Sequence, residues 1–141
     1  MLLPSGGDAA NALAISILGS IENFVKLMNN KANSLGLNNT LFTNATGLDN
    51  GDNHSNVFDV ATILRYALKN TEFKKIYEIR KYTMANGMKL IASIERSSKR
   101  LHLNVNYIKG SKTGSTSLAG VCFGSWLFFY TKFHHYLNYI K

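Results

Sequence analysis

The 141-residue sequence has one cysteine, one proline and no long apolar segment. The single cysteine, Cys122, excludes an intrachain disulfide and any zinc site built from several cysteines, and it is most simply a small buried apolar residue. The most apolar run, residues 121–130, is shorter than the ~20 residues a helix needs to cross a bilayer. The first seven residues, MLLPSGG, have neither the basic start nor the apolar stretch of a signal peptide. We expect no disulfide, no metal, no cofactor and no membrane span.

The rest of the composition is that of a globular domain. Apolar residues make up 45% and charged residues 17% of the chain, and eleven glycines without a period exclude a collagen-like repeat. The length suits one domain with its own hydrophobic core.

Acidic residues are scarce in the middle of the chain. Residues 61–114 carry twelve basic and three acidic groups (12 − 3 = +9), whereas residues 1–60 carry two and five (2 − 5 = −3). Such a segment suits an anionic partner, which could be nucleic acid, an acidic membrane surface or a carboxylate-bearing polymer. Tyr77, Tyr82 and Tyr107 interleave with the cations, yet no nucleic-acid module signature accompanies them, so we expect a solvated face. The cations concerned are Lys74, Lys75, Arg80, Lys81, Arg96, Lys99 and Arg100.

The first half of the chain predicts helices. An alanine-rich helix over residues 8–18 ends at Gly19, and a second is capped by Ser20 and closed by Gly36. A third begins near Asn56, and Phe73, Ile76 and Tyr77 indicate a short fourth. Residues 37–52 are rich in turn formers, with a short strand-like stretch at 40–43.

The second half predicts short strands at residues 81–85, 88–93, 101–105 and 107–115, separated by Gly, Asn or Ser. Helices followed by strands favour an α+β fold in one domain. Residues 122–141 differ in being rich in aromatics, which suggests a strand followed by an atypical tail. His134 and His135 lie in that tail, and as neighbours they point apart, so they are poor candidates for a metal site.

Two short motifs are candidates for chemistry: Ser5-Gly6-Gly7-Asp8 before the first helix, and Lys112-Thr113-Gly114 in the last predicted strand. Each is weak alone. Ser-x-x-Asp ahead of an apolar run is typical of a helix N-cap, and an isolated strand lysine is usually just exposed.

The order of the motifs and of the blocks between them resembles the low-molecular-mass D-alanyl-D-alanine carboxypeptidases, which are penicillin-binding serine peptidases. The resemblance covers residues 1–121 and implies helices packed on an antiparallel sheet. A class A β-lactamase shares the same signatures, but the Gly47-Leu48-Asp49 and His54 blocks fit it less well. The blocks in order are residues 4–14, 24–29, 35–37, 47–49, His54 with Asp59, and 112–120.

The resemblance also implies roles for individual residues. The family transfers the acyl group of a peptidoglycan stem peptide ending in D-Ala-D-Ala to a serine and then hydrolyses it, and β-lactams bind intact members. Ser5 matches the proton relay of the Ser-x-Asn signature, and Lys112 and Thr113 match the groups that receive the terminal carboxylate. Gly114 leaves room for the peptide, and the backbone N–H of Ser115 matches an oxyanion donor. The family works outside the cytoplasmic membrane, on the cell-wall side.

The sequence departs from the family at several positions. No Ser-x-x-Lys motif, the source of the nucleophile, occurs in the 141 residues. The resemblance places that motif before Met1, so we expect a truncated and inactive chain. Gly7 stands where the family has Asn, the His54 block is one residue short, and the likeness fades after Val121. We therefore give His54 no catalytic role. The alternative function is a non-catalytic basic module that binds peptidoglycan or another polyanion.

Overall fold

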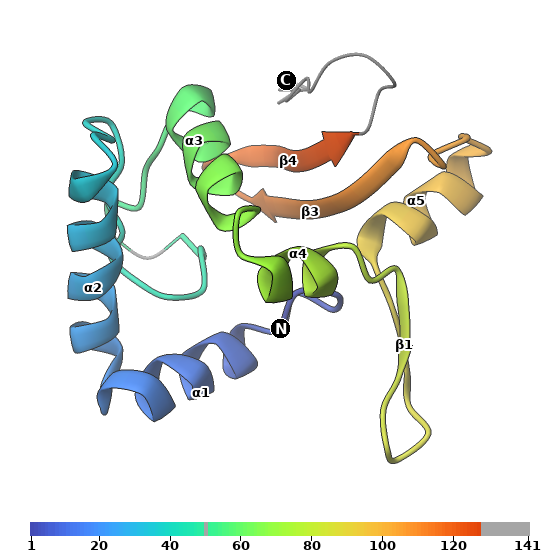
Figure 1. The fold of residues 1–141 in the computed structure, drawn as a ribbon, viewed down its shortest axis with the longest axis horizontal. Helices are drawn as coiled ribbons and strands as arrows, with labels where there is room; N and C mark the ends of the chain where they lie inside the picture. Colours follow the sequence, from blue (N-terminus) through green and yellow to red (C-terminus); the bar gives the residue numbers. More distant parts are fainter. Residues whose placement is uncertain (50, 128–141) are drawn as a thin grey trace.

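A computed structural model of the chain describes residues 1–49 and 51–127, which form an α+β fold as predicted. Figure 1 shows α1 and α2 on one side of the molecule and the long β3–β4 hairpin on the other, with α3, α4 and α5 around the hairpin. The elements in chain order are α1 (Gly7–Leu18), α2 (Ile21–Ser34), α3 (Val57–Ala67), α4 (Thr71–Tyr77), β1 (Lys81–Thr83), β2 (Lys89–Ile91), α5 (Ser93–Leu101), β3 (Ile108–Thr116) and β4 (Gly120–Leu127).

The helix boundaries follow the capping residues read from the sequence. The Ser20 side chain accepts the N–H of Asn23 at 3.1 Å at the start of α2. Asn56 does the same for Asp59 at 2.8 Å at the start of α3. Gly19 ends α1 with φ 76°, in the left-handed region that glycine adopts without a steric penalty. These three predictions are confirmed.

One strand prediction is wrong and a second is confirmed only in part. The predicted strand at residues 101–105 is absent, because residues 93–101 form α5 and the chain then turns into β3. Only Ile94 and Leu101 are large apolar residues in α5, so the sequence shows no helical periodicity there. Ile94 packs on the core and Ser98 is buried, so tertiary contacts stabilise this helix. The stretch at residues 40–43 forms a single antiparallel bridge between Leu41 and His54.

The core lies against the β3–β4 hairpin. The two strands pair antiparallel, from Ile108 opposite Leu127 to Thr116 opposite Gly120. Val105 joins Ile108 and Leu127 in the buried cluster, and Ile94 and Phe123 pack against it. Only the second half of β4 is covered in this way. Cys122 in the first half is therefore exposed, contrary to prediction.

The structure describes the predicted C-terminal strand as β4, which ends at Leu127. The rest of the predicted aromatic tail, residues 128–141 with His134 and His135, lies outside the described residues. Over residues 1–49 and 51–127, no helix combines the length and the apolar character needed to span a bilayer.

Arg80 ties β1, α5 and β3 together. Its Nη2 donates to the carbonyl oxygen of Val105 at 2.7 Å and also to that of Ile108. Its Nη1 donates to Glu95 Oε1 at 3.1 Å, and both side chains are largely shielded from solvent. The rigid guanidinium fork satisfies the carbonyls of the turn that leads into β3, and so helps to fix where β3 begins.

Candidate active site

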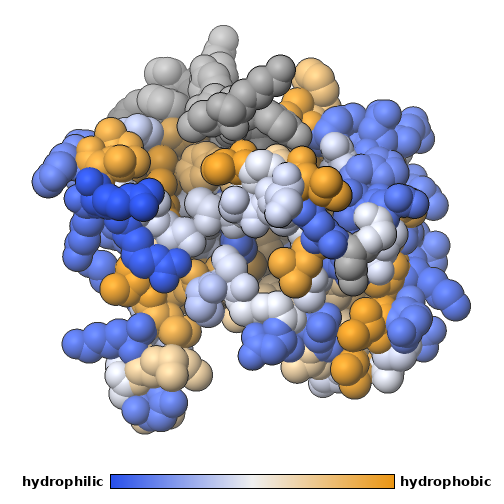
Figure 2. Space-filling model, turned by 180° about the vertical axis from the view of Figure 1, so that it is seen from behind, coloured by the Kyte–Doolittle hydropathy of each residue, from blue (hydrophilic) through white to orange (hydrophobic). Residues whose placement is uncertain are grey.

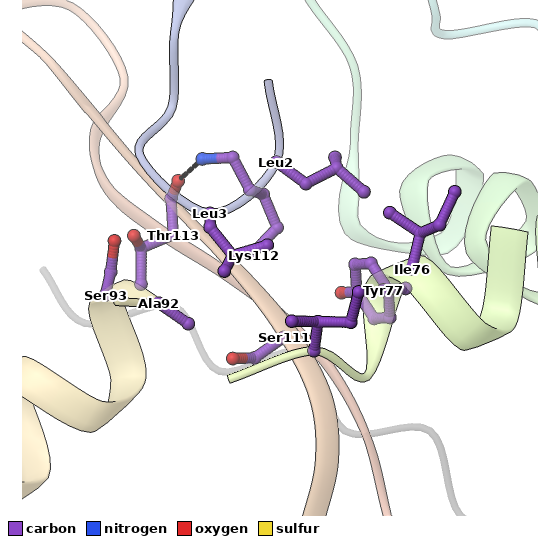
Figure 3. A pocket seen from close by; sticks show the side chains of 10 residues that line it. Leu2, Leu3, Ile76, Tyr77, Ala92, Ser93, Ser111, Lys112 and Thr113 are labelled. Atoms are coloured by element: carbon purple, nitrogen blue, oxygen red, sulfur yellow. Dashed lines mark hydrogen bonds between the residues drawn. The ribbon is translucent and has the colours of Figure 1, made fainter. Parts of the chain in front are cut away.

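The two motifs singled out in the sequence meet in space. Ser5 lies in the turn before α1 and Lys112 lies in the middle of β3, and Lys112 Nζ donates a hydrogen bond to Ser5 Oγ at 2.6 Å. Lys112 Nζ also donates to the carbonyl oxygen of Thr113 (Figure 3). Figure 1 shows the N-terminal segment lying beside α4 and below β3. The fold therefore places a serine hydroxyl and a lysine ammonium, 107 residues apart in sequence, in direct contact.

Ser5 does not cap α1, so that interpretation of Ser-x-x-Asp is wrong. The N-cap residue is Gly6, and no side chain bonds to the first turn. Ser5 has φ 57°, a left-handed conformation that is uncommon for a residue other than glycine. The N–H of Gly6 donates to the carbonyl of Met1 at 3.1 Å, which holds the preceding turn in place. The Ser5 hydroxyl is thereby directed to Lys112 instead of to the helix.

Lys112 lies in an environment suited to an anionic ligand. It lines a small, shallow hollow that is open to solvent (Figure 3). Burial lowers the pKa of Lys112 from its ordinary value of 10.5. Among residues 1–49 and 51–127, no acidic side chain lines this hollow, so none of them offers a carboxylate there to compete for the ammonium. Its other lining residues are Leu2, Leu3, Ile76, Tyr77, Ile79, Ala92, Ser93, Ser111 and Thr113.

The remaining predicted site residues lie on β3 and at the start of α1. Gly114 pairs with Cys122 and Ser115 with Val121 in the β3–β4 ladder. Among the described residues, β4 is the only strand that pairs with β3. Gly7 is the first residue of α1. A side chain at that position would be within ordinary contact distance of Thr46.

Tyr77 is a structural part of the site that the sequence did not reveal. Its hydroxyl donates to the carbonyl oxygen of Gly124 at 2.9 Å, and burial raises its pKa, so it stays a donor. Its ring lies against Gly110, where an added methyl carbon would come within 2.5 Å of Tyr77 Cδ1. The glycine two residues before Lys112 is the only sequence signal of this contact. Because Tyr77 is only 6% exposed, it is not available to stack on a nucleic-acid base.

Asp49 is a second residue whose role was not predicted. Its carboxylate accepts the N–H of Leu118 at 2.9 Å, in the turn that joins β3 to β4. That backbone hydrogen bond is the main reason the pKa of Asp49 is lowered. The loop at residues 47–49 therefore supports the end of the Lys112-Thr113-Gly114 strand.

Solved structures place this fold among the D-alanyl-D-alanine carboxypeptidases and penicillin-binding proteins. A D-alanyl-D-alanine carboxypeptidase from Mycobacterium tuberculosis matches with a TM-score of 0.78 and 29% identity, over 99% of this chain and 54% of that one. Penicillin-binding protein D2 from Listeria monocytogenes, in its cefotaxime-bound form, matches with a TM-score of 0.77 and 30% identity, over 94% and 53%. The predicted fold class is confirmed.

The profile of peptidase family S11, D-alanyl-D-alanine carboxypeptidase, matches residues 1–125, and the chain belongs to this family. It is 39% identical to the carboxypeptidase DacF of Bacillus subtilis over 123 residues, which cover 85% of the chain and 31% of DacF. The chain thus spans about a third of the length of this curated relative. The family resemblance seen in the sequence is confirmed, and the match ends within β4.

Proposed function

We propose that the chain supplies the carboxylate-binding side of a serine-type D-Ala-D-Ala carboxypeptidase site that acts on peptidoglycan stem peptides. The observation that carries this proposal is the contact of 2.6 Å between Ser5 Oγ and Lys112 Nζ. A hydroxyl and an ammonium in contact form a short path for a proton, and Lys112 also lines a small hollow that is open to solvent. The site belongs on the cell-wall side of the bacterial membrane, where the peptide is found.

In this proposal each group of the site has one role. The Lys112 ammonium attracts the terminal carboxylate of the D-alanine, and the Thr113 hydroxyl donates a directed hydrogen bond to it. Burial around Lys112 strengthens this attraction, because fewer water molecules compete for the charge. Ser5 passes a proton between the reacting groups and Lys112. The backbone N–H of Ser115 stabilises the tetrahedral oxyanion.

The chain by itself binds the ligand and does not turn it over. No Ser-x-x-Lys motif occurs in the sequence, so the serine that forms the acyl-enzyme has no counterpart here. Gly7 also replaces the Asn whose amide would hold the substrate. A lost nucleophile costs more than the ~10²–10³ in rate that one oxyanion donor contributes. β-Lactams are accordingly expected to acylate only a protein that has the complete site.

Carboxylate recognition is tested by titrating the chain with a peptide ending in D-Ala-D-Ala, followed by NMR. We expect Lys112→Met to weaken binding by about tenfold or more, because it removes a charge-assisted hydrogen bond. The same peptide with a C-terminal amide serves as the matched ligand control and should bind the native chain as weakly as the acid binds the variant. Equal affinity for acid and amide would refute the assignment of Lys112.

Catalytic inactivity is tested with a fluorescent penicillin. We expect no covalent adduct after gel electrophoresis and mass spectrometry, with a complete family carboxypeptidase as the positive control. An adduct on any serine of this chain would show that it contains a nucleophile.

A second candidate function is a non-catalytic module that binds peptidoglycan or another polyanion. The charge of +9 over residues 61–114 (12 − 3) favours it. Such binding should fall steeply with salt and should be unchanged by Lys112→Met, because many cations share the ligand. Binding that depends on Lys112 favours the first proposal.

A further inference from the structure

The β1–β2 hairpin extends away from the body of the protein. All residues from Lys81 to Lys89 are exposed, whereas Leu90 and Ile91 at the base of the hairpin are half-buried. Figure 1 shows it extending below α5, and Figure 2 shows the same region as a separate lobe at the lower left. A two-stranded hairpin that is not packed on another element is only marginally stable. We therefore looked for a function that its exposed residues could serve.

The two faces of the hairpin differ in chemistry. Tyr82 pairs with Leu90, and Met84 and Met88 follow two residues further along the same side. Since side chains alternate along a strand, these four share one face. Tyr82, Met84 and Met88 are 54%, 40% and 54% exposed. The opposite face carries Lys81, Thr83, Lys89 and, at the base of the hairpin, Ile91.

The tip holds its two methionines side by side. The N–H of Met84 donates to the carbonyl of Met88 at 2.8 Å, and the N–H of Met88 donates to Asn86 Oδ1 at 3.0 Å. Gly87 has φ 81°, which suits the tight turn. These hydrogen bonds therefore set Met84 and Met88 opposite each other, just before and just after the turn.

Cations outnumber acids in the hairpin and in the helix that follows it. Residues 80–100 contain six basic residues and one acidic residue (6 − 1 = +5). The acid is Glu95, which is already paired with Arg80. Arg96, Lys99 and Arg100 are exposed on α5, next to the base of the hairpin (Figure 1).

We propose that this hairpin is a membrane-surface anchor that inserts its apolar face between anionic lipid headgroups. Tyr82, Met84 and Met88 enter the interface, while Lys81 and Lys89 remain at headgroup level, where an anionic surface attracts them. A soluble polyanion would use the lysines and leave the methionines without a partner. The anchor does not involve Lys112 or Ser5, so it is independent of the proposed function.

The test is co-sedimentation of the full chain with vesicles of phosphatidylglycerol and phosphatidylcholine, compared with phosphatidylcholine alone. We expect binding to the anionic vesicles only. Met84→Ser with Met88→Ser should weaken it by at least about tenfold. Lys81→Gln with Lys89→Gln should weaken it about thirtyfold. Lys26→Gln with Leu27→Ser, an exposed pair on α2, is the matched control and should bind as the native chain does.

Two further measurements test whether the variants are folded and whether the hairpin is the part of the chain that binds. Circular dichroism should show native helix content in every variant, and amide exchange of residues 81–91 should slow on anionic vesicles. Binding that depends on the lysines but not on the methionines would identify a polyanion site and overturn the proposal. Equal losses in the α2 control would show unspecific adsorption and would also overturn it.

Discussion

At the scale of single residues, the site depends on how Lys112 is placed. Its ammonium is half-buried in a strand and touches Ser5, and no acidic side chain in the described part of the chain lines the hollow beside it. Removing water from around a cation destabilises its charged form, which lowers its pKa and at the same time favours an incoming carboxylate. Burial of the charged Lys112 thus destabilises the free protein, and a bound anion reduces this destabilisation.

This lowered pKa predicts a pH dependence. A carboxylate ligand binds the charged form of Lys112, so its affinity should be constant near neutral pH and should fall as pH rises through the lowered pKa, before the ordinary 10.5 is reached. Over the same range the free energy of unfolding should rise, because the unfolded chain then holds more protons than the native one. NMR titrations and urea melts between neutral and alkaline pH measure both effects. In Lys112→Met the two slopes should be absent, and slopes that persist would implicate another group.

At the scale of elements, close approach between α4 and the β3–β4 hairpin fixes the strand that carries Lys112. Gly110 allows the ring of Tyr77 to lie against β3, and the Tyr77 hydroxyl bonds across to β4. Arg80 fixes the start of β3 by bonding to the turn before it.

Gly110→Ala should destabilise the chain by about 3 kcal/mol, because the new methyl group would come within 2.5 Å of the Tyr77 ring. Urea unfolding followed by circular dichroism gives the value. Gly124→Ala is the matched control, since its nearest neighbour would be the Tyr77 hydroxyl at 3.9 Å. In a Tyr77→Ala background the penalty at Gly110 should shrink, and an unchanged penalty would exclude this clash as its cause.

Arg80→Met should cost about 3 kcal/mol, because it leaves two carbonyls and the Glu95 carboxylate without their donor. Arg80→Lys keeps the charge but not the fork, so it should restore only part of the loss. Chemical denaturation measures both variants. Arg65→Met, at an exposed position on α3, should change stability by less than about 0.5 kcal/mol. Full rescue by Lys would show that charge alone matters.

At the scale of the whole molecule, apolar surface is poorly covered. No large side chain among the described residues is fully buried, and α1 exposes Leu13, Ile15 and Ile17 at 47%, 49% and 59%. Phe58 on α3 is 80% exposed. Large exposed apolar patches promote association in water.

We therefore predict that the purified chain self-associates and melts over a broad temperature range. Replacing Ile15 and Ile17 by lysine should lower light scattering at a given concentration, because it adds charge to the exposed face of α1. Analytical ultracentrifugation and calorimetry provide the measurements. A monomer with a sharp two-state melt would contradict this prediction.

The sequence alone determined the local features. The side chains of Ser20 and Asn56 bond to the backbone of the helices that they start. Gly19 ends α1 because a residue without a side chain adopts the left-handed conformation easily. These features need no distant contact, so they can be predicted from the sequence. The family could also be identified from the sequence, because the order of the motifs along the chain does not depend on the fold.

Tertiary structure decided the features that depend on distant partners. Residues 93–101 became a helix because Ile94 and Ser98 are buried on it, although the segment has no apolar period of its own. Ser5 has the pattern of a cap, yet its hydroxyl bonds to Lys112, which only the fold brings near. Tyr77 and Asp49 support the site through contacts with Gly124 and Leu118 that span tens of residues. Such contacts form when the chain folds on itself, so no local pattern records them.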